Sequence, residues 1–293
     1  MKMKFLLALA VGFMSACGPF ALNTPKLEPP SARAIVPMKA ERPLVALVLG
    51  GGGTRGFAHV GVIKALEAAG IRPDIVAGSS SGAIVAALYA GGFSGEELER
   101  LAVELDQGAL IDFSLFGRGW VLGEAMQNWV NHSLRNVPIE RLAKPFAVVA
   151  TDAKSGRMVV FNRGDPGLAV RASSAVPDLF VPPVIDGIPY LDGGLTSPVP
   201  VRVARAMGAD YVIAVDLTRY SRSRELAEED LKAADVIIRP QTVRTRLLDF
   251  TAKLENIAAG EQAGRELAGR ITGAIGDAAL RKARNHEARS ILQ

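Results

Sequence analysis

One arrangement occurs twice near the start of the folded region: a short apolar run, a glycine-rich turn and a segment of helical period. The run LVALVL over 44–49 leads through GGGGTRG to a helical pattern over 57–69. DIVAG over 74–78 leads through SSSG to the apolar segment 82–90. Runs so short and rich in Val, Ile and Leu are typical of parallel strands buried on both faces. The sequence therefore predicts an α/β fold with a mostly parallel sheet.

The rest of the chain continues the alternation. Further strands are predicted by the apolar runs at 146–152, 158–162 and 211–216. A hairpin over 183–194 turns at Asp186-Gly187, a pair that tight turns favour. We expect one unit over 44–216 and a mostly helical extension over 217–293 packed on the sheet of the same domain, with one more short strand in 234–240.

The amino-terminal end has the features of an exported protein. Two lysines precede an apolar run over 5–14, which is too short to span a bilayer. Small residues then lead to Cys17, the single cysteine of the chain. This order predicts a signal peptide over 1–16. The sequence MSAC resembles a bacterial lipobox, which implies a lipid on Cys17; the alternative is a plain signal peptide with an incidental cysteine.

Two further features concern where the chain would be held. Gly18 follows the cysteine, and in Gram-negative lipoproteins the absence of Asp there implies delivery to the outer membrane. The stretch 17–43 contains six prolines and little periodicity, which predicts a flexible tether. The net charge of +4 comes from basic residues spread along the chain, so nothing indicates a nucleic-acid partner.

The first glycine-rich turn permits two kinds of site. Gly51, Gly53 and Gly56 fit the G-x-G-x-x-G pattern of dinucleotide sites. Asp74 lies at the spacing of a ribose-binding acid, but it precedes the second strand instead of ending it. Backbone N–H groups over 50–53, at the start of a helix, attract negative charge. That charge is either a phosphate or an oxyanion.

The second turn contains three consecutive serines, and only one fits a nucleophile elbow. The G-x-S-x-G elbow requires glycine two residues before and two residues after the serine. Ser80 lies between Gly78 and Gly82, whereas neither Ser79 nor Ser81 has glycine on both sides. Ser80 is therefore the candidate nucleophile.

None of the three histidines suits a Ser-Asp-His triad. His59 lies on the first predicted helix, where it fits a packing role, and His132 comes too early to follow an acid. His286 lies in the basic terminal segment, which also contains Arg281 and Lys282. That segment fits a solvated helix face or a contact with anionic lipid.

A carboxylate offers another base. Asp192 ends the hairpin and is followed by Gly193 and Gly194, which allow a close approach. An Asp with a pKa of about 3.9 is ionised at neutral pH and can accept the proton of Ser80, although it is a weak base. The oxyanion would then depend on stabilisation by the glycine loop.

These motifs together resemble the patatin-like phospholipase family, in the bacterial branch similar to neuropathy target esterase. The matching stretches are GGGGTRGFAHVGVIKALEAAGI, GSSSG, ASSAVPDLFVPPV, DGG and GADYVIAVD, within 44–216. The resemblance implies a three-layer α/β/α hydrolase that needs no metal or other cofactor.

The resemblance also assigns roles to individual residues. It implies that Ser80 is the nucleophile and Asp192 its proton acceptor, without a histidine. It implies that the glycines 51–53 form the oxyanion hole and that Arg55 orders that loop.

We therefore expect a serine acyl-hydrolase of lipid esters, with membrane phospholipid or another lipid ester as substrate. Transfer of the acyl group to an alcohol other than water is a variant of this activity. The alternative is a non-enzymatic lipoprotein that binds a nucleotide or phosphate in the same loop. Aromatic residues and glycines over 106–136 indicate either ordinary packing or an apolar flap at 113–120, with Trp129 packed.

Overall fold

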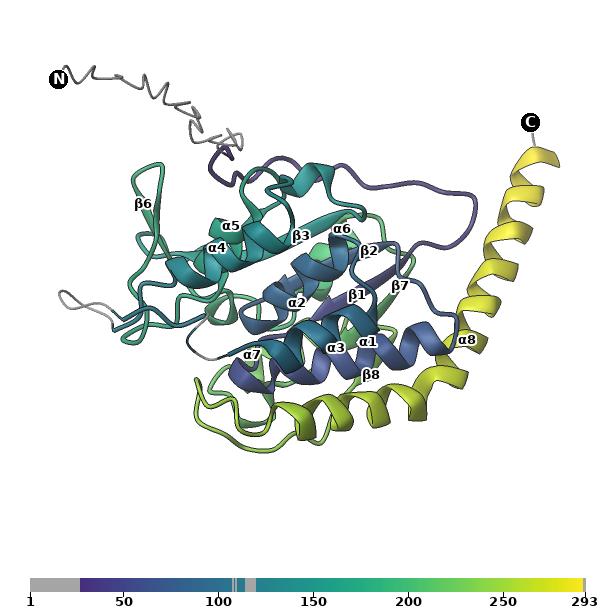
Figure 1. The fold of residues 1–293 in the computed structure, drawn as a ribbon. Coiled ribbons are helices and arrows are strands. Elements are labelled where there is room, and N and C mark those ends of the chain that lie inside the picture. Colours follow the sequence, from purple (N-terminus) through teal and green to yellow (C-terminus); the bar gives the residue numbers. More distant parts are fainter. Residues whose placement is uncertain (1–26, 107, 109, 114–119, 292–293) are drawn as a thin grey trace, which may run out of the picture.

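The computed structural model describes residues 27–106, 108, 110–113 and 120–291, with side chains to residue 284. An eight-stranded sheet forms its centre (Figure 1). Five strands are parallel, in the spatial order β3 (Phe146–Asp152), β2 (Ile75–Ser79), β1 (Val45–Leu49), β7 (Tyr211–Val215) and β8 (Val236–Ile238). The antiparallel strands, at the β3 side, are β4 (Met158–Phe161), β5 (Val184–Ile185) and β6 (Ile188–Leu191). The predicted mostly parallel sheet is confirmed.

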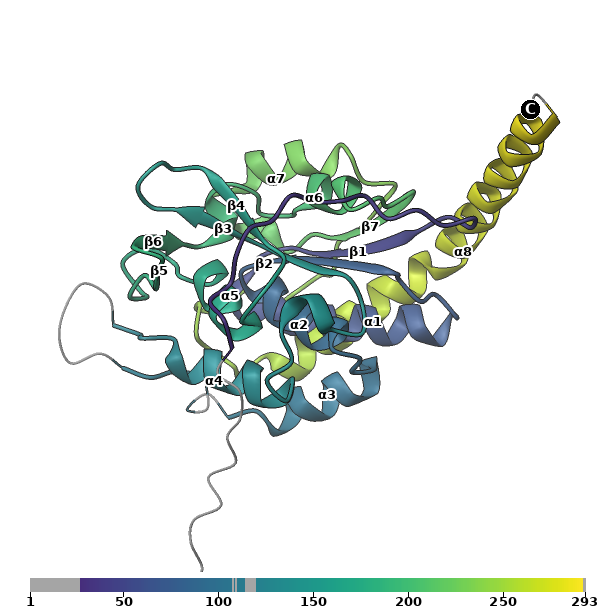
Figure 2. The same cartoon turned by 90° about the horizontal axis from the view of Figure 1, so that it is seen from above.

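Helices cover both faces of the sheet (Figure 2). One face carries α1 (Ala58–Ala68), α2 (Ser81–Ala90), α3 (Gly95–Glu104), α4 (Glu124–Ser133), α5 (Pro166–Ser173) and α8 (Lys253–Ile291). The other face carries α6 (Val201–Ala206) and α7 (Arg224–Leu231). Single turns of 3-10 helix are η1 (Gly53–Phe57), η3 (Ile139–Arg141), η4 (Gly193–Leu195) and η5 (Thr218–Tyr220).

The alternation of side chains along β1 produces the two hydrophobic cores. Leu47 and Leu49 point into the larger core, and Ala46 and Val48 into the smaller one. All four are completely buried, because a central parallel strand is covered on both faces. The layers are thus helix, sheet, helix, as predicted.

The long helix α8 packs closely on α1. A Cβ atom on Gly61 of α1 would lie 1.9 Å from the carbonyl oxygen of Ile257, and one on Gly260 would lie 1.9 Å from that of Ala58. Only glycine permits this contact between the two backbones. Helix α8 thus packs on the same domain, mainly on α1 and with fewer contacts to β8, and its last turns project from the body (Figures 1 and 2). Among the described helices, none combines the length and apolarity that crossing a membrane requires.

Residues 28–43 form an extended strap along the folded body. The Ser31 N–H donates to the Arg163 carbonyl oxygen at 3.0 Å, and the Met38 N–H donates to the Met207 carbonyl oxygen at 2.8 Å. Asn162 exchanges two side-chain hydrogen bonds with the backbone of the strap. The prediction of a flexible tether is wrong for this part of 17–43, because backbone partners far along the chain hold it in place.

Candidate active site

Ser80 occupies the sharp turn between β2 and α2. Its φ of 51° lies in the left-handed region, which is strained for a residue with a side chain. A Cβ atom on Gly78 would lie 2.7 Å from the Ala83 Cα, and one on Gly82 would lie 2.2 Å from the Leu49 carbonyl oxygen. The two glycines let the strand, turn and helix approach one another, as an elbow requires.

Asp192 directly follows β6 and contacts Ser80, which directly follows β2. The Ser80 hydroxyl donates to Asp192 Oδ2 at 2.6 Å, although 112 positions separate the two residues. The other carboxylate oxygen, Oδ1, accepts the Gly194 N–H at 2.7 Å. The Thr151 hydroxyl donates to the Asp192 carbonyl oxygen and fixes the backbone there. Gly193 packs so tightly on β3 that a Cβ atom would lie 2.2 Å from the Val149 carbonyl oxygen.

Burial makes Asp192 a stronger base than the sequence indicated. Its side chain is removed from water, and this raises its pKa to about 6. The hydrogen bonds from Ser80 and Gly194 oppose the shift, because they favour the ionised form. The expectation of an ordinary pKa near 3.9 is therefore wrong. At neutral pH the group is ionised and its pKa lies closer to that pH, which improves a general base.

The raised pKa predicts that Asp192→Asn stabilises the fold. An acid whose folded pKa exceeds its unfolded pKa loses stability as pH rises from about 4 to about 6. Above pH 6 the penalty of a shift of about two pKa units is about 3 kcal/mol. Asparagine keeps the shape without the charge. Urea unfolding should show Asp192→Asn more stable than wild type at pH 8, by up to this amount, and little different at pH 4.

The control for this measurement is Asp178→Asn, which changes an exposed aspartate. Its stability difference from wild type should not follow this pH course. If Asp192→Asn and wild type had the same free energy of unfolding at pH 8 as well as at pH 4, ionisation of the buried Asp192 would not destabilise the fold.

The glycine loop lies directly beside Ser80. A Cβ atom on Gly51 would lie 3.2 Å from the Ser80 Cβ, and one on Gly52 would lie 2.8 Å from the Leu217 Cβ. Side chains at these positions would therefore press on the nucleophile and on the wall behind the loop. The sequence prediction that a glycine loop and Ser80 share one site agrees with this placement.

The backbone N–H groups of the loop are not equally available. The Gly51 N–H donates to the Pro198 carbonyl oxygen at 2.9 Å. The Gly52 N–H donates to the Ser81 hydroxyl oxygen at 3.0 Å. The Gly53 N–H has no hydrogen-bond partner among the described residues. Of the three predicted donors, Gly53 is the one left to bind a ligand.

Arg55 and Gly56 continue the loop into η1. The Arg55 Nε–H donates to the Gly52 carbonyl oxygen at 2.9 Å, so its side chain closes the loop on itself. A Cβ atom on Gly56 would lie 2.8 Å from the Ser81 hydroxyl oxygen, which places Gly56 against the start of α2.

Ser173 and Ser81, to which the sequence gave no role, and His59, for which it predicted a packing role, hold this site together. The Ser173 hydroxyl accepts the Ser80 N–H at 2.8 Å, and the Ser81 hydroxyl accepts a loop N–H. His59 is fully buried and its Nε2 donates to the Gly50 carbonyl oxygen at 2.8 Å. Burial lowers the His59 pKa to about 4, so the ring is neutral at pH 7. Ser173 lies in the quoted ASSAVPDLF stretch, which was the only signal for it.

No histidine other than His59 lies at the site among the described side chains. His132 is exposed on α4, and the side chain of His286 lies outside the described residues. His59 donates its hydrogen bond to the Gly50 carbonyl oxygen of the glycine loop. The Ser80 hydroxyl instead donates to Asp192. In the described part of the chain, no group of three or more His, Cys, Asp or Glu side chains could hold a metal ion.

An apolar pocket of about 120 Å³ opens beside Ser80. Its walls come from η1, α2, α4, the residues Leu105, Leu110 and Ile111, and the segments 174–180 and 247–250. Apolar walls with few polar groups are typical of sites for apolar ligands. Trp129 packs on the core as predicted. Trp120 is 70% exposed, and residues 114–119 of the predicted flap lie outside the described residues.

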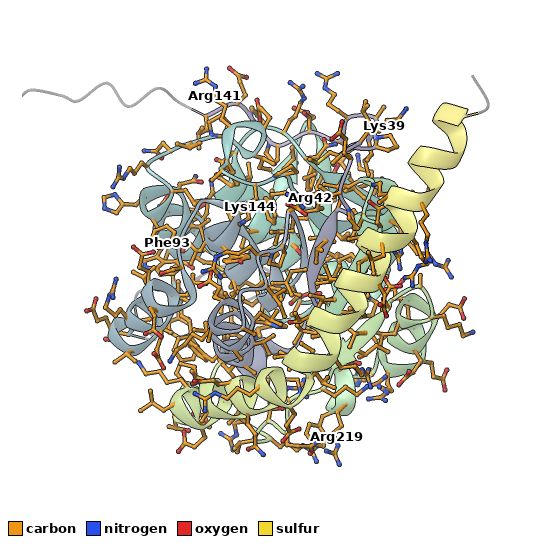
Figure 3. All side chains as sticks on the ribbon, turned by 90° about the vertical axis from the view of Figure 1, so that its right-hand side faces the viewer. Lys39, Arg42, Phe93, Arg141, Lys144 and Arg219 are labelled. Atoms are coloured by element: carbon orange, nitrogen blue, oxygen red, sulfur yellow. The ribbon has the colours of Figure 1, made fainter. Side chains whose placement is uncertain are left out.

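Asp74 lies at the opposite end of the strands from the glycine loop. Its carboxylate pairs with Arg42 at 2.5 Å and accepts the Val45 N–H at the start of β1. Figure 3 shows Arg42 on this side of the molecule, with Lys144 nearby. A ribose-binding acid belongs at the carboxyl end of the second strand. The position of Asp74 thus counts against a dinucleotide site.

Comparison with known proteins finds relatives over the part of the chain that contains these residues. An uncharacterised NTE family protein of Mycobacterium tuberculosis is 38% identical over 191 residues, which are 64% of this chain and 53% of that protein. The chain thus covers about half the length of this relative. Patatin-like phospholipase domain-containing protein 6 of Homo sapiens is 36% identical over 182 residues, 59% of this chain and 13% of that protein.

A solved structure shows the same fold at low sequence identity. VipD from Legionella pneumophila is similar with a TM-score of 0.56 and 15% identity, over 83% of this chain and 71% of VipD. The model of the family described as patatin-like phospholipase matches residues 47–205, which include the glycine loop, Ser80 and Asp192. Since the match extends over more than half of the 293 residues, the chain belongs to the patatin-like phospholipase family.

Proposed function

We propose that the protein is a serine acyl-hydrolase that cleaves carboxyl esters of lipids. The observation that carries this proposal is the 2.6 Å hydrogen bond from the Ser80 hydroxyl to Asp192, beside an apolar pocket. Family membership agrees with the predicted class of enzyme, an esterase or lipase. The apolar pocket wall fits an acyl chain.

The first half of the reaction forms an acyl-enzyme. The Ser80 Oγ attacks the ester carbonyl carbon while Asp192 accepts its proton. Negative charge develops on the carbonyl oxygen, where the Gly53 N–H can donate to it. When the tetrahedral intermediate collapses, the bond to the alkoxy oxygen breaks. The proton on Asp192 passes to that oxygen, and the alcohol leaves.

The second half releases the acyl group. Asp192, ionised again, takes a proton from water as the water oxygen attacks the acyl-enzyme. The second tetrahedral intermediate expels Ser80, whose oxygen recovers the proton from Asp192. The products are a carboxylic acid and free enzyme. If another alcohol replaces water, the same steps transfer the acyl group to it.

A fluorophosphonate probe tests the proposal, because it reacts covalently with activated serine nucleophiles. The wild-type protein should be labelled on Ser80, identified by mass spectrometry of the peptide, and it should hydrolyse lipid esters. Ser80→Ala should remain unlabelled. Absence of labelling and of hydrolysis in folded wild-type protein would contradict the proposal and favour a non-enzymatic phosphate-binding protein.

Membrane attachment is a separate part of the proposal. The sequence MSAC supports a lipid on Cys17, a residue outside those the structure describes, and Gly18 supports delivery to the outer membrane. A lipidated cysteine with several acyl chains anchors a protein stably, whereas one chain does not. Cys17→Ser should move the protein out of the membrane fraction, or leave its signal peptide uncleaved, without lowering hydrolysis of soluble esters. Normal processing together with membrane retention would contradict the lipid anchor.

A further inference from the structure

Three arginines surround one tyrosine next to the glycine loop. The guanidinium carbons of Arg55, Arg219 and Arg244 lie 5.5, 5.6 and 5.8 Å from the centre of the Tyr220 ring. Tyr220 ends η5, directly after β7, and is 45% exposed. We call these four residues the arginine cluster. Three separate parts of the chain, η1, η5 and the β8–α8 connection, build it.

The β8–α8 connection ties the cluster to the candidate active site. The Thr245 hydroxyl, next to Arg244, hydrogen-bonds the Thr54 hydroxyl of η1 at 2.8 Å. Leu247 packs against Gly53, and both line the pocket that contains Ser80. A molecule whose ester lies at Ser80 can therefore extend a polar end toward the cluster.

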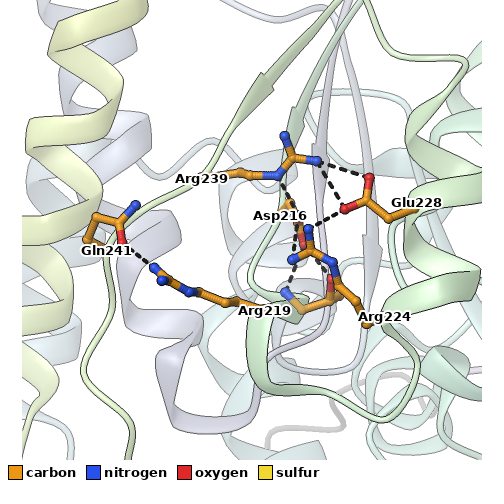
Figure 4. A network of polar contacts seen from close by, with 7 residues as sticks. Asp216, Arg219, Arg224, Glu228, Arg239 and Gln241 are labelled. Atoms are coloured by element: carbon orange, nitrogen blue, oxygen red, sulfur yellow. Dashed lines mark hydrogen bonds and ion pairs between the residues drawn. The ribbon is translucent and has the colours of Figure 1, made fainter.

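The nearest acidic side chains are bound by other arginines (Figure 4). Asp216 is buried and pairs with Arg239 at 2.9 Å. Glu228 pairs with Arg239 at 3.2 Å and also with Arg224. These pairs form a nearly neutral group beside the cluster. Asp216 still favours the charged form of Arg55, but its hydrogen bonds come from Arg239 and Thr218 and not from the cluster.

The cluster itself has no carboxylate partner within the described residues. The Arg55 Nε–H goes to the Gly52 carbonyl, and its buried Nη1 has no hydrogen-bond partner there. Arg219 donates to the side-chain oxygen of Gln241, a neutral group (Figure 4). Burial lowers the Arg55 pKa, and the positive charge of Arg244 lowers it as well, while Tyr220 and Asp216 act in the opposite direction. Three like charges thus lie together, and none of them forms an ion pair with a carboxylate of the described residues.

An aromatic ring attracts guanidinium groups but does not neutralise them. Cation–π contacts at exposed sites are weak, and several like charges around one ring repel one another. An anion among the three groups would remove this repulsion. Guanidinium groups match phosphate oxygens in charge and in geometry.

We propose that the arginine cluster binds the phosphate of a phospholipid headgroup and selects headgroups with net negative charge. This inference rests on the proposed ester hydrolysis and specifies its substrate. A zwitterionic headgroup would bring its ammonium group close to three guanidinium groups, with no unpaired carboxylate to receive it. A headgroup such as that of phosphatidylglycerol carries no such cation.

The test compares substrates that differ only in headgroup. Full-length protein is assayed with dihexanoyl-phosphatidylglycerol and dihexanoyl-phosphatidylcholine, both kept monomeric so that membrane charge plays no part. The neutral ester p-nitrophenyl hexanoate reports hydrolysis without a headgroup. We expect kcat/KM to be about tenfold or more higher for the phosphatidylglycerol, because the ammonium group of the phosphatidylcholine would be repelled by three guanidinium groups.

Arg219→Gln/Arg244→Gln should remove this preference. Its kcat/KM for the phosphatidylglycerol should fall about tenfold or more, while p-nitrophenyl hexanoate is cleaved as by wild type. The matched control, Arg222→Gln/Arg270→Gln, removes the same charge from two exposed arginines outside the cluster. This control variant should have the same kcat/KM as wild type for all three substrates.

Inorganic phosphate separates a headgroup site from a site for free phosphate. It should inhibit cleavage of the phosphatidylglycerol competitively and leave the neutral ester unaffected. If inorganic phosphate changed the rate of p-nitrophenyl hexanoate hydrolysis, the cluster would be a regulatory site for free phosphate, and the inference would be overturned.

Two other results also overturn it. One is equal kcat/KM for the two phospholipids in an enzyme that cleaves the neutral ester, which leaves the proposed function intact. The other is an equal loss in the two double variants. If wild type cleaves no ester and the probe does not label Ser80, the proposed function fails as well.

Discussion

Ser80→Ala and Asp192→Asn should each reduce kcat for ester hydrolysis by about 10⁴-fold or more, and the double variant should be no worse than either. The two side chains share one hydrogen bond of 2.6 Å and act on the same proton, so removing either disables both. Initial rates on a neutral ester measure the effect, with circular dichroism to establish that each variant is folded.

Controls for this experiment come from neighbouring and competing residues. Ser79 precedes the nucleophile and its hydroxyl is buried without a partner, so Ser79→Ala should remain active. His132→Ala should also keep wild-type turnover, because His132 is exposed on α4. His59→Ala should retain measurable turnover but lose stability, because the buried ring holds the Gly50 carbonyl. A folded histidine variant as inactive as Ser80→Ala would show that the proton does not pass to Asp192.

Gly53→Ala should lower kcat by about 100-fold with little change in KM, the cost of losing one oxyanion donor. Gly53 has a φ of +60°, and an added Cβ would lie 2.5 Å from the Leu247 Cδ1. Alanine would therefore force the backbone of this pocket-lining residue to move, and its N–H would move with it. Steady-state kinetics on a soluble ester separate kcat from KM.

Gly70→Ala is the matched control. Gly70 also has a positive φ, of +75°, but an added Cβ there would meet no atom within 4 Å. It imposes a similar backbone strain away from the site and should leave kcat unchanged. A Gly53→Ala effect confined to KM would favour binding of a phosphate by the loop over stabilisation of an oxyanion.

The sequence predicted those parts of the molecule that short segments determine. The apolar runs of β1 and β2 and the glycines at 78 and 82 are local signals, since a buried strand and a tight elbow limit which residues fit. Asp192 could be singled out because two glycines follow it. The strength of Asp192 as a base could not be predicted, because its pKa depends on burial by segments far away in the chain.

The contacts that the sequence did not reveal all join distant segments. The Ser173 hydroxyl reaches Ser80 across 93 positions, and Thr245 reaches Thr54 across 191. A motif can point to one member, as ASSAVPDLF does for Ser173, but no periodicity identifies its partner, because the pairs follow from how the helices and connections pack. The arginine cluster is of this kind: its members are unremarkable in the sequence and meet only in the fold.

The strap over 28–43 affects how the protein can be shortened for laboratory work. The start of β1 at Val45 suggests a truncation that begins at residue 44. It would, however, remove the partners of the Arg163 and Met207 carbonyls and of the Asn162 side chain, and uncover apolar surface beneath Ile35. Exposed backbone at such an edge can pair with a second molecule. Truncated protein that begins at Glu28 keeps that edge covered, and a start at residue 44 favours aggregation.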